Sequence, residues 1–243
     1  MLSITCLVEP GARKPENDDR AVVNGVMIAE GMYSEEAKGP SLLVLCDGVG
    51  GEAYGYKAAE IAAGCFSWSS DMILSRGAIE ALAASANHAI REARGQGRPF
   101  ARMATTIAGL YIHDKDYVAF NAGDTRVLRF RAPYLYQIST DHTVWQEQVR
   151  AGGALRQGQE NMLTRYLGGE YVQPDIVEGV GQVFPQDMYI LCTDGVWHWL
   201  KDEEIERVLS DGQTLEGKCR TLVDAAMKNG STDNLSVIIA RRG

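Results

Sequence analysis

Short apolar runs separated by polar breaks make up most of the hydrophobic pattern of this chain, and they predict β-strands. Some runs are divided only by tight polar breaks, such as HDKD at 113–116 and RAP at 131–133. Breaks of this kind favour antiparallel pairing of neighbouring strands. The expected strands cover residues 2–8, 21–29, 41–46, 104–112, 116–121, 126–131, 134–138, 175–183, 187–193 and 235–241.

Apolar residues at three- and four-residue intervals predict helices elsewhere in the chain. The clearest apolar stripe runs through residues 77–94, and a second runs through 214–227. Acidic residues fill the first turn of 202–210, where the helix dipole favours them. A further helix is expected within 52–66, after a group of glycines. Strands with hairpin-like connections and flanking helices indicate an α+β fold in which helices cover antiparallel sheets.

A single domain is expected over residues 1–243, because the chain shows no internal repeat, low-complexity tract or Pro/Gly/Ser-rich linker. One segment, residues 141–170, is polar and glycine-rich although it lies between strands. We interpret it as a short helix followed by a flap, and we call these residues the flap.

The composition is that of an acidic globular protein, with 45% hydrophobic and 23% charged residues and a net charge of −8. Nothing in it supplies the basic face that nucleic acid binding requires. No apolar run approaches the roughly 20 residues of a membrane span, and Glu9 and Pro10 interrupt any signal peptide. The five scattered cysteines never show C-x-x-C spacing, which is typical of a reduced, cytoplasmic protein.

Five aspartates flank apolar strands, and two of them are followed directly by glycine. They are Asp19, Asp47, Asp124, Asp194 and Asp233. Aspartate is common in turns, so one such residue means little. A folded sheet brings strand ends together, however, and clustered carboxylates repel one another unless a cation neutralises them. Ligands that are all oxygen suit Mg²⁺ or Mn²⁺, and Gly48 would let its own carbonyl approach a metal.

Two alternative interpretations, a dinucleotide-binding site and a phosphatase with an aspartyl nucleophile, fit the same residues less well. The glycines after Asp47 match the dinucleotide pattern G-x-G-x-x-A at 48–53, but no βαβ unit surrounds them and Asp71 does not end a second strand. A phosphatase with an aspartyl nucleophile would need a second aspartate at position 49, which is Val49. The histidines lack the usual zinc-site spacings.

Eight short motifs follow one another along nearly the whole chain. They are GARKPENDDRAVV, LVLCDGVGGEAYGYKAAEIA, MATTIAGLYI, NAGDTRVLRF, ISTDHTVWQEQ, NMLTRYLGG, YILCTDGVWHWLKDEEI and GSTDNLSVIIARR. In this order they resemble the motifs of the type 2C metal-dependent serine/threonine protein phosphatases in their compact bacterial form. The resemblance implies an α-β-β-α sandwich of two antiparallel sheets flanked by helices, with a binuclear metal site at one end.

The resemblance implies metal roles for residues that match the family's ligands. Asp47 would bridge two Mg²⁺ or Mn²⁺ ions, and the carbonyl of Gly48 would bind one of them. Asp194 and Asp233 would hold the first ion. The pair at 18–19 would serve the second ion and its waters.

Two further implications of the resemblance concern a third ion and the catalytic set. Asp124, together with Asp194, matches residues that hold a third, weaker ion in many bacterial members. The catalytic set would comprise Asp19, Asp47, Asp194 and Asp233, acting through a water that the ions activate.

The chain departs from the family pattern at three positions. The phosphate-gripping arginine of the family falls on Lys14, so that either Lys14 or the preceding Arg13 would bind phosphate. Glu52 stands where some members have a histidine, and we expect Glu52→Ala to be mild. His198 stands where some relatives have an acidic residue, and we interpret it as a packing residue at a helix start.

We therefore expect a monomeric cytoplasmic enzyme that hydrolyses phosphoserine and phosphothreonine in proteins and reverses a cognate bacterial serine/threonine kinase. Specificity would lie in the flap and in residues 30–40. The alternative is a non-catalytic sensor or binding module with the same fold. Such a protein would usually lack an aspartate at one of the positions matched by Asp47, Asp194 or Asp233, and all three are present.

Overall fold

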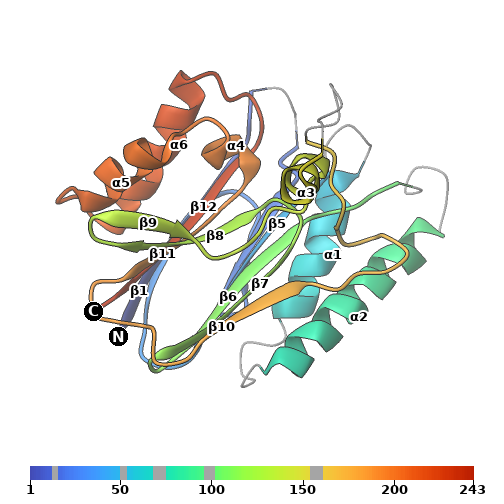
Figure 1. Ribbon diagram of the computed structural model, residues 1–243, viewed down its shortest axis with the longest axis horizontal. Coiled ribbons are helices and arrows are strands. Elements are labelled where there is room, and N and C mark those ends of the chain that lie inside the picture. Colours follow the sequence, from blue (N-terminus) through green and yellow to red (C-terminus); the bar gives the residue numbers. More distant parts are fainter. Residues whose placement is uncertain (13–15, 50–53, 68–74, 96–101, 154–160) are drawn as a thin grey trace.

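The computed structural model describes residues 1–12, 16–49, 54–67, 75–95, 102–153 and 161–243. Two antiparallel sheets face each other, and helices cover both outer faces (Figure 1). In spatial order the first sheet contains β4 (Gly31–Ala37), β1 (Leu2–Glu9), β12 (Leu235–Arg242), β11 (Met188–Cys192), β8 (Arg126–Arg131) and β9 (Tyr134–Gln137). The second contains β10 (Asp175–Gly179), β7 (Asp116–Ala122), β6 (Ile107–His113), β5 (Ser41–Asp47), β2 (Asp19–Val23) and β3 (Val26–Ile28).

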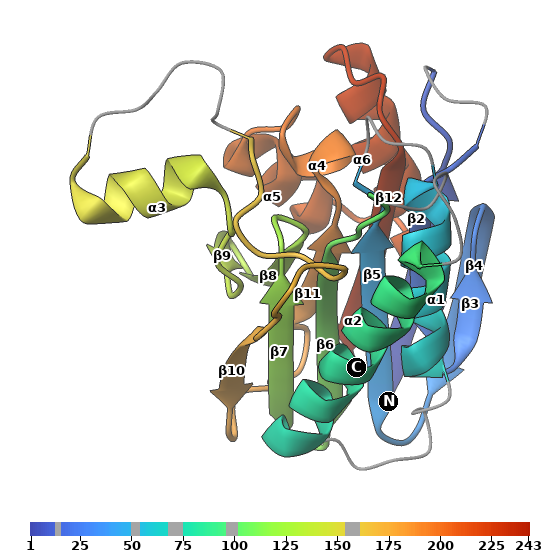
Figure 2. The same cartoon turned by 90° about the vertical axis from the view of Figure 1, so that its right-hand side faces the viewer.

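Helices α5 (Asp202–Ser210) and α6 (Leu215–Lys228) cover the first sheet. Helices α1 (Gly55–Ser67) and α2 (Arg76–Arg94) cover the second (Figures 1 and 2). Two shorter helices, α3 (Val144–Ala151) and α4 (Asp194–Trp197), lie in the connections. The expected α-β-β-α sandwich is confirmed.

The central strands are buried on both faces, which explains why they are continuously apolar in the sequence. In β5, Leu43 and Leu45 face the space between the sheets, while Leu42 and Val44 pack under α1 and α2. The same alternation in β12 divides its side chains between the inter-sheet core and the layer under α5 and α6. Alternation of side chains along a strand therefore supplies two cores at once.

One strand prediction was wrong in detail, and one strand was not predicted. The run 21–29 is a hairpin, because Asn24 and Gly25 both take positive φ angles, 46° and 87°, and turn β2 into β3. The stretch 30–40 contains a complete strand, β4, which pairs with β1 along its length. Its polar composition hid it, because β4 is an edge strand with alternate side chains exposed.

None of the helices in the described residues has the length and apolar character that a membrane span needs.

Helix α6 buries a lysine that ties it to the end of α5. The Lys218 ammonium donates hydrogen bonds to the carbonyls of Val208 and Asp211, each at 2.8 Å, and to Asp211 Oδ1 at 2.7 Å. These acceptors lie at the C-terminal end of α5, where the helix dipole favours a cation. The buried charge is thus compensated by three oxygens.

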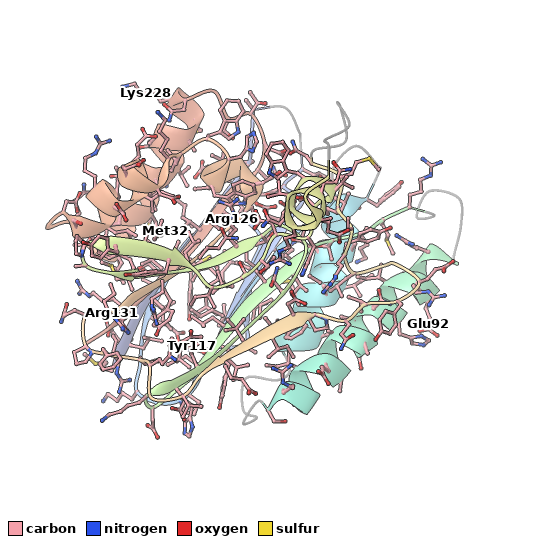
Figure 3. All side chains as sticks on the ribbon, in the orientation of Figure 1. Met32, Glu92, Tyr117, Arg126, Arg131 and Lys228 are labelled. Carbon is pink, nitrogen blue, oxygen red and sulfur yellow. The ribbon has the colours of Figure 1, made fainter. Side chains whose placement is uncertain are left out.

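We expect Lys218→Met to lower the free energy of unfolding by about 2 kcal/mol, because it leaves buried carbonyls without a donor. The matched control is Lys228→Met, at the exposed end of the same helix (Figure 3). Urea denaturation followed by circular dichroism measures both. Equal stability of the two variants would show that the buried ammonium contributes nothing net.

Candidate metal centre

Two aspartates face each other where β2 and β5 meet at one end of the sandwich. The antiparallel register places Asp19 opposite Asp47. The amide of Gly48 donates to the carbonyl of Asp18 at 3.1 Å, so Asp19 and Asp47 form the adjacent pair without hydrogen bonds, in which side chains approach most closely. Like charges directly opposite each other destabilise a sheet. The fold therefore contains a local charge conflict at this point.

Asp19 is held in place by the opposite sheet. Its Oδ2 accepts hydrogen bonds from Ser236 Oγ at 2.6 Å and from Thr193 Oγ1 at 3.2 Å. Its Oδ1 is buried and has no hydrogen-bond partner. Burial raises the pKa of Asp19 to about 7; the hydrogen bond from Ser236 opposes this, and the charge of Asp194 adds to it. A buried carboxylate oxygen without a donor is suited to a cation.

Three more aspartates, Asp194, Asp124 and Asp233, lie close enough for their charges to act on Asp47. Burial, followed by the charges of Asp19 and Asp194, raises the pKa of Asp47 well above its usual range. Burial and then the charge of Asp233 raise the pKa of Asp194, and the charge of Asp194 in turn raises the pKa of Asp47.

Asp124, which lies two residues before the start of β8, joins this cluster. Burial, and then the charge of Asp194, raise the pKa of Asp124 to about 7. The charges of Asp19, Asp194, Asp124 and Asp233 all act on Asp47, so the structure gathers the five aspartates of the strand ends around this residue.

This cluster is not a finished coordination shell. Within the described ranges, no three acidic, histidine or cysteine side chains are arranged as ligands of one ion. The chemistry of the donors nevertheless fits hard cations, because all are carboxylates and one buried oxygen lacks a partner. The individual metal-ligand roles remain predictions.

Glycines allow the segments that carry the aspartates to pack backbone against backbone. A Cβ on Gly195 would lie 1.9 Å from the carbonyl oxygen of Asn234, and one on Gly11 would lie 2.1 Å from that of Asp233. A Cβ on Gly48 would lie 2.4 Å from the carbonyl carbon of Gly55. The Asp-Gly pairs are thus explained by close backbone approach. The sequence predicts that the lack of a side chain at Gly48 lets its carbonyl approach a metal. In the structure, the lack of a side chain also lets Gly48 pack against Gly55, the first residue of α1.

Asp18 has a visible structural role. Its Oδ1 accepts a hydrogen bond from the Tyr56 amide at 2.8 Å, in the first turn of α1. Its own amide donates to Asn234 Oδ1 at 3.0 Å. Asp18 therefore caps α1 from another segment of the chain, and its expected service to a metal remains a prediction.

Three candidates from the sequence, Arg13, Lys14 and Glu52, lie outside the described residues. His198 packs between two indoles, with ring centroids 5.6 Å from Trp197 and 6.0 Å from Trp199. Its expected place at a helix start was wrong, because it caps the C-terminal end of α4.

The short helix expected in the flap is confirmed as α3, which buries none of its residues and projects beyond the sheets (Figure 2). Both ends of the flap are joined to the strands near the cluster. The amide of His142 donates to the Gly123 carbonyl at 3.0 Å, and Leu167 exchanges backbone hydrogen bonds with Thr105. The Thr105 hydroxyl in turn donates to the carbonyl of Asp47 at 2.8 Å.

Sequence reasoning missed the hydroxyl groups that orient Asp19. Ser236 lies in the apolar run 235–241, and Thr193 directly precedes Asp194. A buried hydroxyl in an otherwise apolar strand is the signal that was available, because such a group needs a hydrogen-bond partner.

Comparison with known proteins identifies the family of this site. A family model described as "Protein phosphatase 2C" matches residues 30–236. The chain belongs to the protein phosphatase 2C family. Its homologues are bacterial serine/threonine phosphatases, and metal-dependent dephosphorylation of proteins is the activity of the family.

Relatives of the chain match it over nearly its full length. Protein phosphatase PhpP of Streptococcus pneumoniae is 27% identical over 98% of this chain and 96% of that protein. The structure of the Streptococcus agalactiae serine/threonine phosphatase has a TM-score of 0.87 and 25% identity, with full coverage of both chains. The catalytic domain of PstP, solved in complex with two manganese ions, has a TM-score of 0.82, 23% identity and 99% coverage of both chains.

We expect Gly195→Ala to lower the free energy of unfolding by about 1–3 kcal/mol, because its methyl group would clash with the backbone at Asn234. Gly212→Ala is the control, since a Cβ there would meet nothing within 4 Å. Urea denaturation in EDTA measures both. A Gly195→Ala variant as stable as the Gly212 variant would contradict the required close approach.

We expect Asp47→Asn to raise the free energy of unfolding in EDTA by about 1 kcal/mol, because it removes one charge of the pair facing Asp19. Asp224→Asn, on the exposed face of α6, is the control and should leave stability unchanged. Thermal and urea unfolding in EDTA provide the measurement. A less stable Asp47→Asn variant would mean that the carboxylates do not repel each other as the register implies.

Proposed function

We propose that this chain hydrolyses phosphoserine and phosphothreonine in proteins with the help of two divalent ions, Mg²⁺ or Mn²⁺. The observation that carries the proposal is the pairing of Asp19 with Asp47 across β2 and β5, with Asp194 close enough for its charge to act on both. The unpartnered Oδ1 of Asp19 supports it, because a buried carboxylate oxygen without a donor is suited to a cation. PstP, a structural neighbour, is described with two manganese ions.

The residues would divide the ligand roles by their place in the fold. Asp47 and the Gly48 carbonyl, at the end of β5, would lie between the two ions. Asp194, after β11, and Asp233, before β12, would hold one ion. Asp19 and Asp18, at the start of β2, would serve the other ion and its waters.

A third, weaker site would use Asp124 together with Asp194, which the structure places in electrostatic contact. When bound, such ions make a water nucleophilic near neutral pH and offset the charge of the phosphoryl oxygens.

The chain itself would contribute orientation and substrate binding. Ser236 and Thr193 fix Asp19 from the opposite sheet, so that only its free Oδ1 remains available. Either Arg13 or Lys14 would bind the phosphoryl group of the substrate. Positioning and electrostatic stabilisation of this kind account for most of the catalysis in phosphoryl transfer.

The partners would be phosphorylated proteins and a cognate serine/threonine kinase in the cytoplasm, with the enzyme acting as a monomer. The names of the relatives PhpP and PstP support a role in dephosphorylation of proteins. A non-catalytic sensor with this fold is the second candidate. The intact set of Asp47, Asp194 and Asp233 disfavours it.

We expect Asp233→Asn to lower kcat/KM on a phosphothreonine peptide by about a thousandfold or more, because it removes a charged ligand from the activated-water site. Asp224→Asn is the matched control and should retain wild-type activity. Phosphate release is measured with Mn²⁺ and again with EDTA. Wild-type protein that shows no metal-stimulated turnover would contradict the proposal and favour the sensor.

A further inference from the structure

An arginine at the start of β8 connects the flap to the carboxylate cluster. Arg126 follows Asp124 by two residues and is labelled in Figure 3. Its Nε lies 3.1 Å from both carboxylate oxygens of Asp141, and its Nη2 lies 2.7 Å from Oδ2. The side chains are only 21% and 11% exposed. This partly buried bidentate ion pair fixes the orientation of the guanidinium, and Asp141 is the first residue of the flap.

The guanidinium of Arg126 also stacks on an indole. Its Cζ lies 3.4 Å from the ring centroid of Trp197, a close cation–π contact. The indole Nε1–H of Trp197 donates a hydrogen bond to the backbone carbonyl of Asp124 at 3.0 Å. Arg126 therefore contacts the flap through Asp141, and it contacts Trp197, which is hydrogen-bonded to Asp124.

Trp197 lies on the same short helix as a second carboxylate. It is the last residue of α4, whose first residue is Asp194. The Trp197 amide also donates to the Thr193 carbonyl, and the Thr193 hydroxyl donates to Asp19. The indole thus holds Asp124 against the segment that carries Asp194.

We propose that Arg126 and Trp197 are positioning residues, which hold Asp124 against Asp194 and connect this pair to the base of the flap through Asp141. The inference rests on the proposed function, because the metal roles of Asp124 and Asp194 belong to it. Contacts that orient metal ligands from outside typically change metal affinity by about 10- to 100-fold. Arg126 and Trp197 should therefore determine how strongly the site formed by Asp124 and Asp194 binds Mn²⁺.

Trp197→Phe tests the inference directly, because it keeps an aromatic face for Arg126 and removes only the N–H that holds Asp124. The control is Trp199→Phe, two residues away, where the ring packs against Gly230 and is 37% exposed. Titration calorimetry of the full chain with Mn²⁺ gives the affinities. We expect Trp197→Phe to weaken the weakest class of sites about tenfold, and the control to match wild type.

Asp141→Asn is a second variant, which weakens the ion pair and leaves the indole in place. We expect it to weaken the same class of sites by about threefold, because it acts through Arg126 and Trp197. Melting temperatures in EDTA separate positioning from stability, since a purely structural role would lower them without changing Mn²⁺ affinity.

Identical Mn²⁺ isotherms for wild type, Trp197→Phe and Asp141→Asn would overturn this inference and leave the metal centre intact. A lower melting temperature in EDTA with unchanged affinity would overturn it as well. Wild-type protein that binds no Mn²⁺ would overturn the proposed centre itself, and this inference with it. The wild-type titration therefore distinguishes the two failures.

Discussion

The opposition of Asp19 and Asp47 across β2 and β5 is the constraint on which the rest of this structure depends. An antiparallel register that buries Ala21, Val23, Leu43 and Leu45 between the sheets also brings the two carboxylates together at the strand ends. The apolar pairs stabilise the register and the charged pair opposes it. The apolar core is extensive enough to outweigh the repulsion between Asp19 and Asp47. The two carboxylates therefore remain close together, where a cation can neutralise their charge.

The cluster lies at the seam between two sheets, and each sheet supplies part of it. Asp19 and Asp47 come from the second sheet, Ser236 lies in the first sheet, and Thr193 and Asp194 directly follow its strand β11. The glycines at 48 and 195 remove the side chains that would keep these segments apart. Because both halves contribute, any displacement of one sheet against the other changes the arrangement of the carboxylates directly.

The fold could be predicted from the sequence largely because its central strands are apolar on both faces. The polar edge strand β4 was missed for the opposite reason, since partial exposure removes the apolar signal. The aspartates were found because they flank apolar strands, but the side chains that orient them were not. The roles of Ser236, Trp197 and Lys218 depend on partners distant in the sequence or on contacts made only after packing, and no local pattern reveals such partners.

The bond between Ser236 and Asp19 joins residues that are 217 positions apart, and β12 pairs with β1 over its whole length. Contacts of such long separation form late, because the intervening chain must first be made and ordered. During synthesis on the ribosome, β1 and β2 emerge long before the strand that orients Asp19. A chain cut short before β12 would lack Ser236, which orients the Asp19 carboxylate. Incomplete translation products would therefore have no phosphatase activity.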